Sequence, residues 1–195
     1  KRKSRVITLG GDHSITLPVV RAYARAYQNL NILHFDAHPD LYDVLNGNRY
    51  SHACPFARIM EENLAARLVQ VGIRTLTGHQ REQAQRFGVE LIEMKNIKAA
   101  KKLSFEDPVY LSLDIDCLDP AYAPGVSHHE PGGMSTRELL EIIQNFNGVL
   151  VGADLVEFNP ERDVQGMTAM VAGKLLKELI GRMMEDRPWI SDKAE

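Results

Sequence analysis

Short runs of apolar residues recur along the chain, and each run ends in polar residues. Their length and composition predict buried strands at residues 5–9, 31–35, 68–73, 89–93, 109–115 and 149–156. Between the runs, apolar positions three or four residues apart predict helices at 14–28, 55–67, 79–87, 135–146 and 166–184. Ser135 and Glu138 have the spacing of a capping box, which marks the start of the fourth helix.

The alternation of strands and helices predicts the fold class. Parallel neighbouring strands need a crossover connection, and a helix supplies it. We therefore predict an α/β fold in which helices cover both faces of a mostly parallel sheet. The chain has 195 residues, of which 44% are apolar, so we treat residues 1–195 as a single domain.

Composition excludes several classes of protein. No window contains the roughly 18 uncharged apolar residues of a membrane span. The net charge is −3, and the basic run from Lys1 to Arg5 is short and has no aromatic residues, so we expect no nucleic-acid partner and no membrane partner. Cys54 and Cys117 are too few for a disulfide framework, which favours an intracellular, reducing location.

Three of the apolar runs end in residue types that bind metal ions. The three endings read GGDHS at 10–14, HFDAHPD at 34–40 and DIDCLDP at 114–120. Alternation along an extended chain places Asp36, His38 and Asp40 on one face, and likewise Asp114 and Asp116. The carboxyl ends of parallel strands meet at one edge of a sheet, so these groups should converge. Burying so many carboxylates together is very costly unless cations neutralise them.

The ligand types narrow the choice of metal. Carboxylate and imidazole without thiolate suit Mn²⁺, Fe²⁺, Co²⁺ or Ni²⁺ better than a structural zinc site. Six candidate ligands exceed the needs of one ion, whereas two ions about 3.5–4 Å apart would use them all and activate water. Each motif taken alone also fits a helix cap or a turn. The joint pattern predicts a hydrolase with a pair of divalent ions.

The order of these motifs resembles the ureohydrolase family, which contains arginases and agmatinases. The resemblance is carried by GGDHS at 10–14, DAHPD at 36–40, SLDIDCLDPAYAPG at 112–125, EPGG at 130–133 and GADLVEFNP at 152–160. It implies a three-layer α/β/α fold, with about the first third of such a protein absent from this sequence. It also implies two Mn²⁺ ions per chain, with the following ligands: His13 and Asp40 on one ion, His38 and Asp116 on the other, and Asp36 and Asp114 bridging.

The resemblance also implies roles for residues around the ions. Family members cleave a guanidinium group, which is always cationic, and Glu157 matches the carboxylate that faces it. His52 matches the histidine that passes a proton to the departing amine, although Ala53 stands where many members have glycine. Together with Asp116, these two residues form the expected catalytic set. The expected substrate-binding residues are Glu157, His128, Asn48 and Ser51.

The sequence alone is compatible with several hypotheses about the function. The SHHEPGG motif at 127–133 resembles plant-type arginases and favours L-arginine over agmatine or another small cationic guanidino compound. A metal-binding paralogue without catalysis is disfavoured because all six ligand positions are present, and a phosphoesterase because the strand ends are acidic. The resemblance further implies a homo-oligomer, a trimer or hexamer, in the cytoplasm or, for a plant-type enzyme, in mitochondria.

Overall fold

The computed structural model describes residues 4–185, so Lys1–Lys3 of the basic run lie outside the described residues. Its centre is one six-stranded parallel sheet in the order β1-β6-β5-β2-β3-β4. Each predicted strand is confirmed, with ends that differ by two residues at most. The strands are β1 Ile7–Leu9, β2 Asn31–Phe35, β3 Arg67–Ile73, β4 Glu90–Glu93, β5 Val109–Asp114 and β6 Leu150–Val156.

Within residues 4–185, four α-helices and three 3₁₀ helices lie between the strands, and α5 follows the last strand. Ser135 and Glu138 form the predicted capping box, with each side chain accepting a hydrogen bond from the other's backbone N–H. The elements are η1 His13–Ile15, α1 Thr16–Ala26, α2 Pro55–Glu61, α3 Gly78–Phe87, η2 Met94–Lys102, η3 Ile115–Cys117, α4 Thr136–Asn145 and α5 Met167–Glu185.

The prediction of a helix over 55–67 is wrong beyond Glu61. Asn63 has a left-handed backbone with φ of 53°, which ends the helix. The backbone N–H of Leu64 then donates to the carbonyl of Ile59 at 3.0 Å, and the chain turns into β3. The sequence also gave no sign of η2, which is short and kinked at Asn96.

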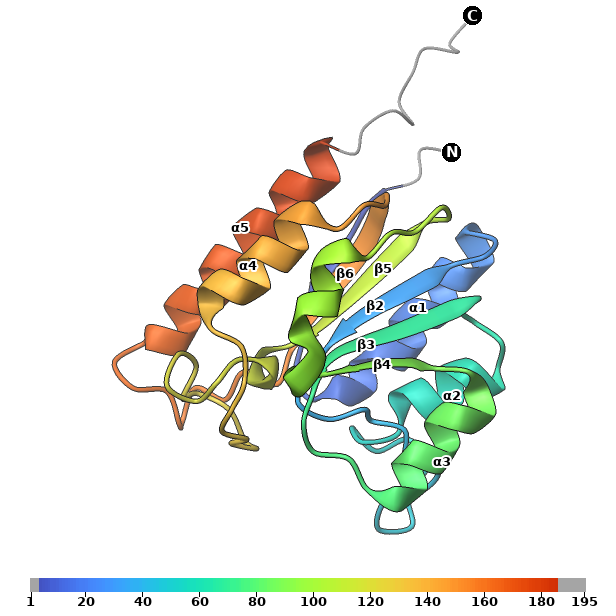
Figure 1. Cartoon of the computed structure of the whole chain (residues 1–195), viewed down its shortest axis with the longest axis horizontal. Helices are drawn as coiled ribbons and strands as arrows, with labels where there is room; N and C mark the ends of the chain where they lie inside the picture. Colours follow the sequence, from blue (N-terminus) through green and yellow to red (C-terminus); the bar gives the residue numbers. More distant parts are fainter. Residues whose placement is uncertain (1–3, 186–195) are drawn as a thin grey trace, which may run out of the picture.

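Helices cover both faces of the sheet, which confirms the three-layer α/β/α arrangement (Figure 1). On one face, α4, α5 and η2 pack on strand residues such as Leu33 and Leu111. On the other face, α1, α2 and α3 pack on residues such as Ile32 and Tyr110. Leu33 and Ile32 are neighbours in β2, so the alternation of side chains along the strand feeds both apolar layers.

The sheet order places four strand ends beside one another. β1, β6, β5 and β2 are consecutive neighbours and parallel, so the loops that leave their carboxyl ends emerge at the same edge. Ligand sites of open α/β sheets occur at this edge. Among residues 4–185, none of the helices combines the length and the apolar character that crossing a membrane requires.

Candidate metal centre and pocket

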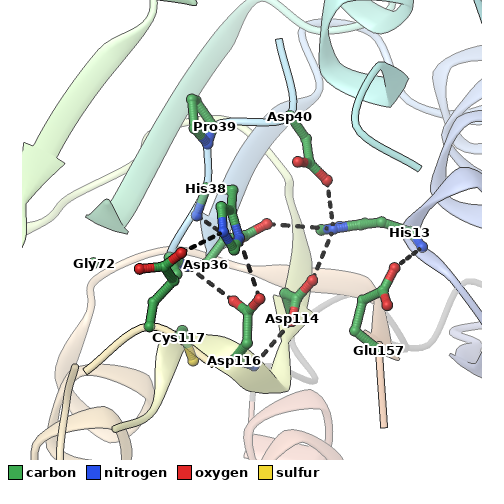
Figure 2. A network of polar contacts seen from close by, with 12 residues as sticks. His13, Asp36, His38, Pro39, Asp40, Gly72, Asp114, Asp116, Cys117 and Glu157 are labelled. Carbon is green, nitrogen blue, oxygen red and sulfur yellow. Dashed lines mark hydrogen bonds and ion pairs between the residues drawn. The ribbon is translucent and has the colours of Figure 1, made fainter. Parts of the chain in front are cut away.

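Six acidic and imidazole side chains converge at this edge of the sheet, as Figure 2 shows. All of them are buried except the partly exposed His38. The structure thus brings together every metal ligand that the sequence predicts. They come from the last residue of β5 and from the segments that follow β1, β2 and β5: His13, Asp36, His38, Asp40, Asp114 and Asp116.

His13 provides the clearest test of whether the site fits a metal ion. Its Nδ1 atom is buried and has no hydrogen-bond partner. Carboxylate oxygens surround this atom at 3.2–3.4 Å, one each from Asp36, Asp40 and Asp114 (Figure 2).

The other ring nitrogen of His13 fixes the tautomer. Nε2 lies 2.9 Å from the hydroxyl oxygen of Ser112, and that hydroxyl donates to Asp154 at 2.7 Å. Ser112 therefore accepts the Nε2 proton, so Nδ1 is the ring nitrogen that can offer a lone pair to a cation. Although burial opposes the shift, the three carboxylates raise the pKa of His13 well above its ordinary value, so Nδ1 holds a proton among them unless a cation takes its place. The arrangement fits a divalent ion whose histidine ligand is oriented by an outer hydrogen bond.

Asp36 links His13 to a second set of ligands. One of its oxygens lies 3.4 Å from Nδ1 of His13, and the other lies 3.3 Å from Nδ1 of His38. The same His38 atom lies 3.2 Å from an oxygen of Asp116. Asp36 thus offers one oxygen to each imidazole, so it could serve both sets of candidate ligands.

Electrostatics support the same conclusion. Burial, together with the charges of Asp116 and Asp36, raises the pKa of Asp114 well above its ordinary value. Burial and the charge of Asp36 raise the pKa of Asp116 to about 7. Without a cation, Asp114 and Asp116 therefore hold protons that exposed carboxylates would release, whereas hydrogen bonds from histidines outweigh burial and lower the pKa of Asp36. Divalent ions bound in place of these protons would allow all the carboxylates of the cluster to ionise.

His34 lies beside the cluster but serves a different purpose. Its Nδ1 atom lies 3.0 Å from the amide nitrogen of Gln70, which also donates to the carbonyl of Pro39 at 2.6 Å. Nδ1 of His34 is therefore an acceptor, and Nε2 carries the proton that it donates to Asp36 at 2.9 Å. His34 supports Asp36 and has no lone pair left for an ion.

A pocket of about 190 Å³ opens onto this cluster. Its volume is below the roughly 300–1,000 Å³ of pockets for drug-sized ligands, so it suits a small metabolite. Among the described residues, no lysine or arginine lines it. Besides members of the cluster, its walls are formed by Tyr42, Leu45, His52, Ala53, Thr75, Thr77, Gln80, His128 and Glu157.

Glu157 follows β6 and lines the pocket beside His13 (Figure 2). It has a left-handed backbone with φ of 65°. Its carboxylate accepts a hydrogen bond from the backbone N–H of His13 at 2.7 Å. Burial raises the pKa of Glu157 above its ordinary value, although this hydrogen bond opposes the shift. The pocket thus contains a fixed carboxylate that is suited to a cationic ligand.

His52 and His128 lie on opposite loops of the pocket wall. Their rings stack with centroids 5.7 Å apart and planes 19° from parallel. His128 also meets the ring of His38 edge to face at 6.0 Å. The structure therefore places both predicted histidines in the pocket and connects them to the candidate metal ligands.

Asn48 and Ser51 do not line the pocket. The side-chain oxygen of Asn48 accepts a hydrogen bond from the backbone N–H of Tyr50 at 2.9 Å, so it is engaged in its own turn. The hydroxyl of Ser51 lies 3.4 Å from Nδ1 of His52. Their predicted contact with substrate stays a prediction.

The structure adds residues that the sequence reading passed over. Thr75 and Thr77 follow β3, and the strand-end rule that located the metal ligands also applies to them, although they are not metal-ligand types. Ser112 and Asp154 lie inside strands, where only the pairing of β5 with β6 makes them neighbours.

Comparisons with known proteins agree with this geometry. The model of the arginase family matches residues 1–181. The chain is 54% identical over 191 residues to a protein of Arabidopsis thaliana named arginase 1, mitochondrial, a match that covers 92% of this chain and 55% of that protein. The chain therefore spans about half the length of the curated relatives it matches.

Solved structures show the same similarity. The arginase from Medicago truncatula superposes with a TM-score of 0.87 at 52% identity, covering 92% of this chain and 59% of that one. A triple mutant of an arginase-like protein from T. brucei, bound with Mn²⁺, has a TM-score of 0.82 at 33% identity, covering 91% of this chain and 60% of the other.

Proposed function

The chain belongs to the arginase family, and from this premise we propose that the protein hydrolyses L-arginine to L-ornithine and urea. One observation carries the proposal. Glu157 lies in the same pocket as Asp40, Asp114 and Asp116, so a carboxylate for the guanidinium and a set of metal ligands face one space. Arginine combines a cationic guanidinium with a small size that suits a pocket of about 190 Å³.

We propose that the ions are two Mn²⁺. One set of ligands centres on Nδ1 of His13 and the other on Nδ1 of His38, with Asp36 between them. The remaining members of the cluster are Asp40, Asp114 and Asp116. When bound, the ions would supply the Lewis acidity that makes water nucleophilic at neutral pH.

The protein's own residues then divide the remaining work. Glu157 pairs with the guanidinium and holds its carbon over the cluster. The departing amine needs a proton, and His52 lines the pocket with a side chain of the type that most often transfers protons in enzymes. His128 stacks on His52 and limits its rotation.

Urea release by the full-length protein supplied with Mn²⁺ tests the proposal. We expect the highest kcat/KM with arginine among arginine, agmatine, guanidinobutyrate and guanidine. Absence of urea with all four compounds would contradict the proposed function.

Agmatine is the second candidate, and one observation favours it. Arginine differs from agmatine by its α-carboxylate, but neither lysine nor arginine lines the described pocket. The hydroxyls of Thr75 and Thr77 and the amide of Gln80 are the polar groups there that suit a carboxylate. A higher kcat/KM with agmatine in the same assay would assign the protein to that substrate.

We extend the proposal to location and assembly. The Arabidopsis relative is named as mitochondrial, and we propose a mitochondrial location for this protein. We also propose a homo-oligomer, a trimer or hexamer. Cell fractionation tests the location, and sedimentation of the purified full-length protein tests the assembly, where a monomer would contradict it.

A further inference from the structure

The segment between Asp40 and α2 contains a small hairpin. The backbones of Leu45 and Asn48 exchange hydrogen bonds of 3.2 and 2.9 Å. The two residues between them, Asn46 and Gly47, both have positive φ, of 52° and 78°. Positive φ at both central positions is the geometry of a type I′ turn, which Asn-Gly strongly favours.

This hairpin, residues 42–53, forms one wall of the pocket. The N–H of Tyr42 donates to the carbonyl of Ala53 at 3.0 Å and closes its base. The position of the hairpin therefore determines how much room the far end of a bound substrate has. The hairpin residues that line the pocket are Tyr42, Leu45, His52 and Ala53.

Arg58, from α2, fastens both arms of the hairpin from behind. Only 2% of its surface is exposed. Its Nη1 atom donates to the carbonyl of Asp43 at 2.7 Å and to the carbonyl of Arg49 at 3.4 Å. Its Nη2 atom donates to the side chains of Asp43 at 2.8 Å and Glu61 at 2.7 Å.

The charges make this contact hard to replace. A buried guanidinium is costly unless carboxylates and carbonyls receive its protons, and Asp43 and Glu61 supply the carboxylates. The Arg58 guanidinium in turn lowers the pKa of Asp43. Lysine has one nitrogen in place of the planar fork, so it cannot reach the two arms and Glu61 together.

We propose that Arg58 is a positioning residue that sets substrate selectivity by holding hairpin 42–53 in place. The inference rests on the proposed function, since the selectivity concerns guanidino compounds. The hydrogen bonds described for the Arg58 side chain lie on the hairpin and on Glu61, and none reaches a candidate metal ligand. Loss of Arg58 should therefore alter the pocket wall and leave the ions in place.

Steady-state kinetics of Arg58→Met in the full-length protein, supplied with Mn²⁺, tests selectivity. We expect kcat/KM for the preferred substrate to fall about 10- to 100-fold, because a displaced wall misplaces the substrate. KM should rise by a larger factor than kcat falls, and the arginine-to-agmatine ratio should move toward one. Metal content should equal that of the parent protein.

Amide hydrogen exchange tests, independently of activity, whether Arg58 holds hairpin 42–53 in place. We expect faster exchange in residues 42–49 of Arg58→Met, and an intermediate rate in Arg58→Lys. Arg67→Met is the matched control. Arg67 also donates to a carboxylate, that of Glu90, and to a carbonyl, that of Ser104, but it lies at the start of β3, away from the strand ends that form the pocket. It should change neither the exchange of the hairpin nor the substrate ratio.

Two results would overturn the inference, and they differ from failure of the proposed function. Unchanged hydrogen exchange in Arg58→Met would show that Arg58 does not hold the hairpin in place. An unchanged arginine-to-agmatine ratio would overturn its role in selectivity. Should Arg58→Met not fold, Asp43→Asn should shift the ratio in the same direction by a smaller factor, and an unshifted ratio there would overturn the role equally. The parent protein could release no urea while hydrogen exchange in residues 42–49 still depends on Arg58. That result would overturn the proposed function but would support the role of Arg58 in holding the hairpin.

Discussion

Glu157 holds a backbone conformation that is unfavourable for a residue with a side chain. Its φ of 65° lies in the left-handed region, which costs of order 1–3 kcal/mol and persists where the surrounding structure demands it. The hydrogen bond from His13 N–H fixes the carboxylate in the pocket. The strain and the placement in the pocket support the proposed role of Glu157 and make it testable.

Glu157→Gln should isolate the role of the charge. Glutamine keeps the volume and an oxygen that accepts from His13, but it has no negative charge with which to form an ion pair with a guanidinium. Loss of a hydrogen bond between charged groups is worth about 1.5–3 kcal/mol, so kcat/KM for arginine should fall about 10- to 150-fold with metal content unchanged. Kinetics with Glu161→Gln, which alters an exposed carboxylate nearby, provides the control. An equal loss in both variants would contradict the role.

His52 and Asp114 should respond differently to truncation. His52→Ala removes a proton carrier from the pocket wall, so turnover should fall about 10²- to 10⁴-fold while bound Mn²⁺ stays constant. Asp114→Ala removes a carboxylate that faces Nδ1 of His13, so metal and turnover should be lost together. Metal analysis and urea release on the same samples check both expectations. Intact turnover in His52→Ala would refute its role as proton carrier.

The candidate ligands were predictable because their types and their places at strand ends appear directly in the sequence. Their supporting partners were not. Ser112 and Asp154 are register partners in neighbouring strands, and strand pairing over so long a separation cannot be read from one sequence. The same holds for Gln70 behind His34, since β3 lies next to β2 only in the folded sheet.

At the scale of elements, one guanidinium fastens the loops that surround the cluster. Arg74, just after β3, donates to backbone carbonyl oxygens of the β5 end and of the loop at 126–134. The acceptors are the carbonyls of Gly72, Asp116, Cys117, Leu118 and Glu130. Gly133 is required beside it, because a Cβ there would lie 2.5 Å from the backbone nitrogen of Asp119 and 2.7 Å from Nη2 of Arg74.

Arg74→Lys should loosen this region. Lysine cannot supply donors to all of these carbonyls, and each buried acceptor left unpaired costs about 1–3 kcal/mol. We expect a lower melting temperature and weaker Mn²⁺ binding, because Asp116 belongs to the released segment. Differential scanning calorimetry and metal titration measure the two effects. Arg86→Lys, at an exposed helix position, should change neither quantity, and equal melting temperatures for Arg74→Lys and the parent would contradict the expectation.

Element boundaries were predictable where strands are buried and helices have capping residues, as at Ser135. The end of α2 was not, because Asn63 ends the helix through a left-handed backbone that asparagine tolerates but does not require. The sequence analysis made no prediction of the Asn46-Gly47 turn, and its hairpin is held against α2 by hydrogen bonds from Arg58. Tertiary contacts therefore determine the helix end and the hairpin position that local sequence preferences do not specify.

At the scale of the whole molecule, the sheet gathers acidic groups that the fold cannot stabilise alone. Burial, with the charges of neighbouring carboxylates, raises the pKa of Asp116 to about 7 and that of Asp114 in the same direction. Contacts with Asp116 and Asp36 outweigh the effect of burial and raise the pKa of His38 to about 12. The metal-free fold thus depends on protons that the folded state binds more tightly than the unfolded chain does.

Removal of metal should therefore destabilise the protein more as the pH rises. A carboxyl with a raised pKa contributes stability that is complete below its ordinary value of 3.8 and is lost as the pH passes about 7, as for Asp116. The contribution of His38 to the stability of the metal-free fold is complete below pH 6.5 and is lost as the pH rises toward about 12. It therefore also makes the metal-free fold less stable at higher pH. Melting temperatures with chelator and with Mn²⁺ should differ more at about pH 8 than at about pH 5.5. Asp114→Ala should gain less from Mn²⁺ at either pH, and equal melting temperatures with and without the ion in the parent protein would mean that no metal couples to this cluster.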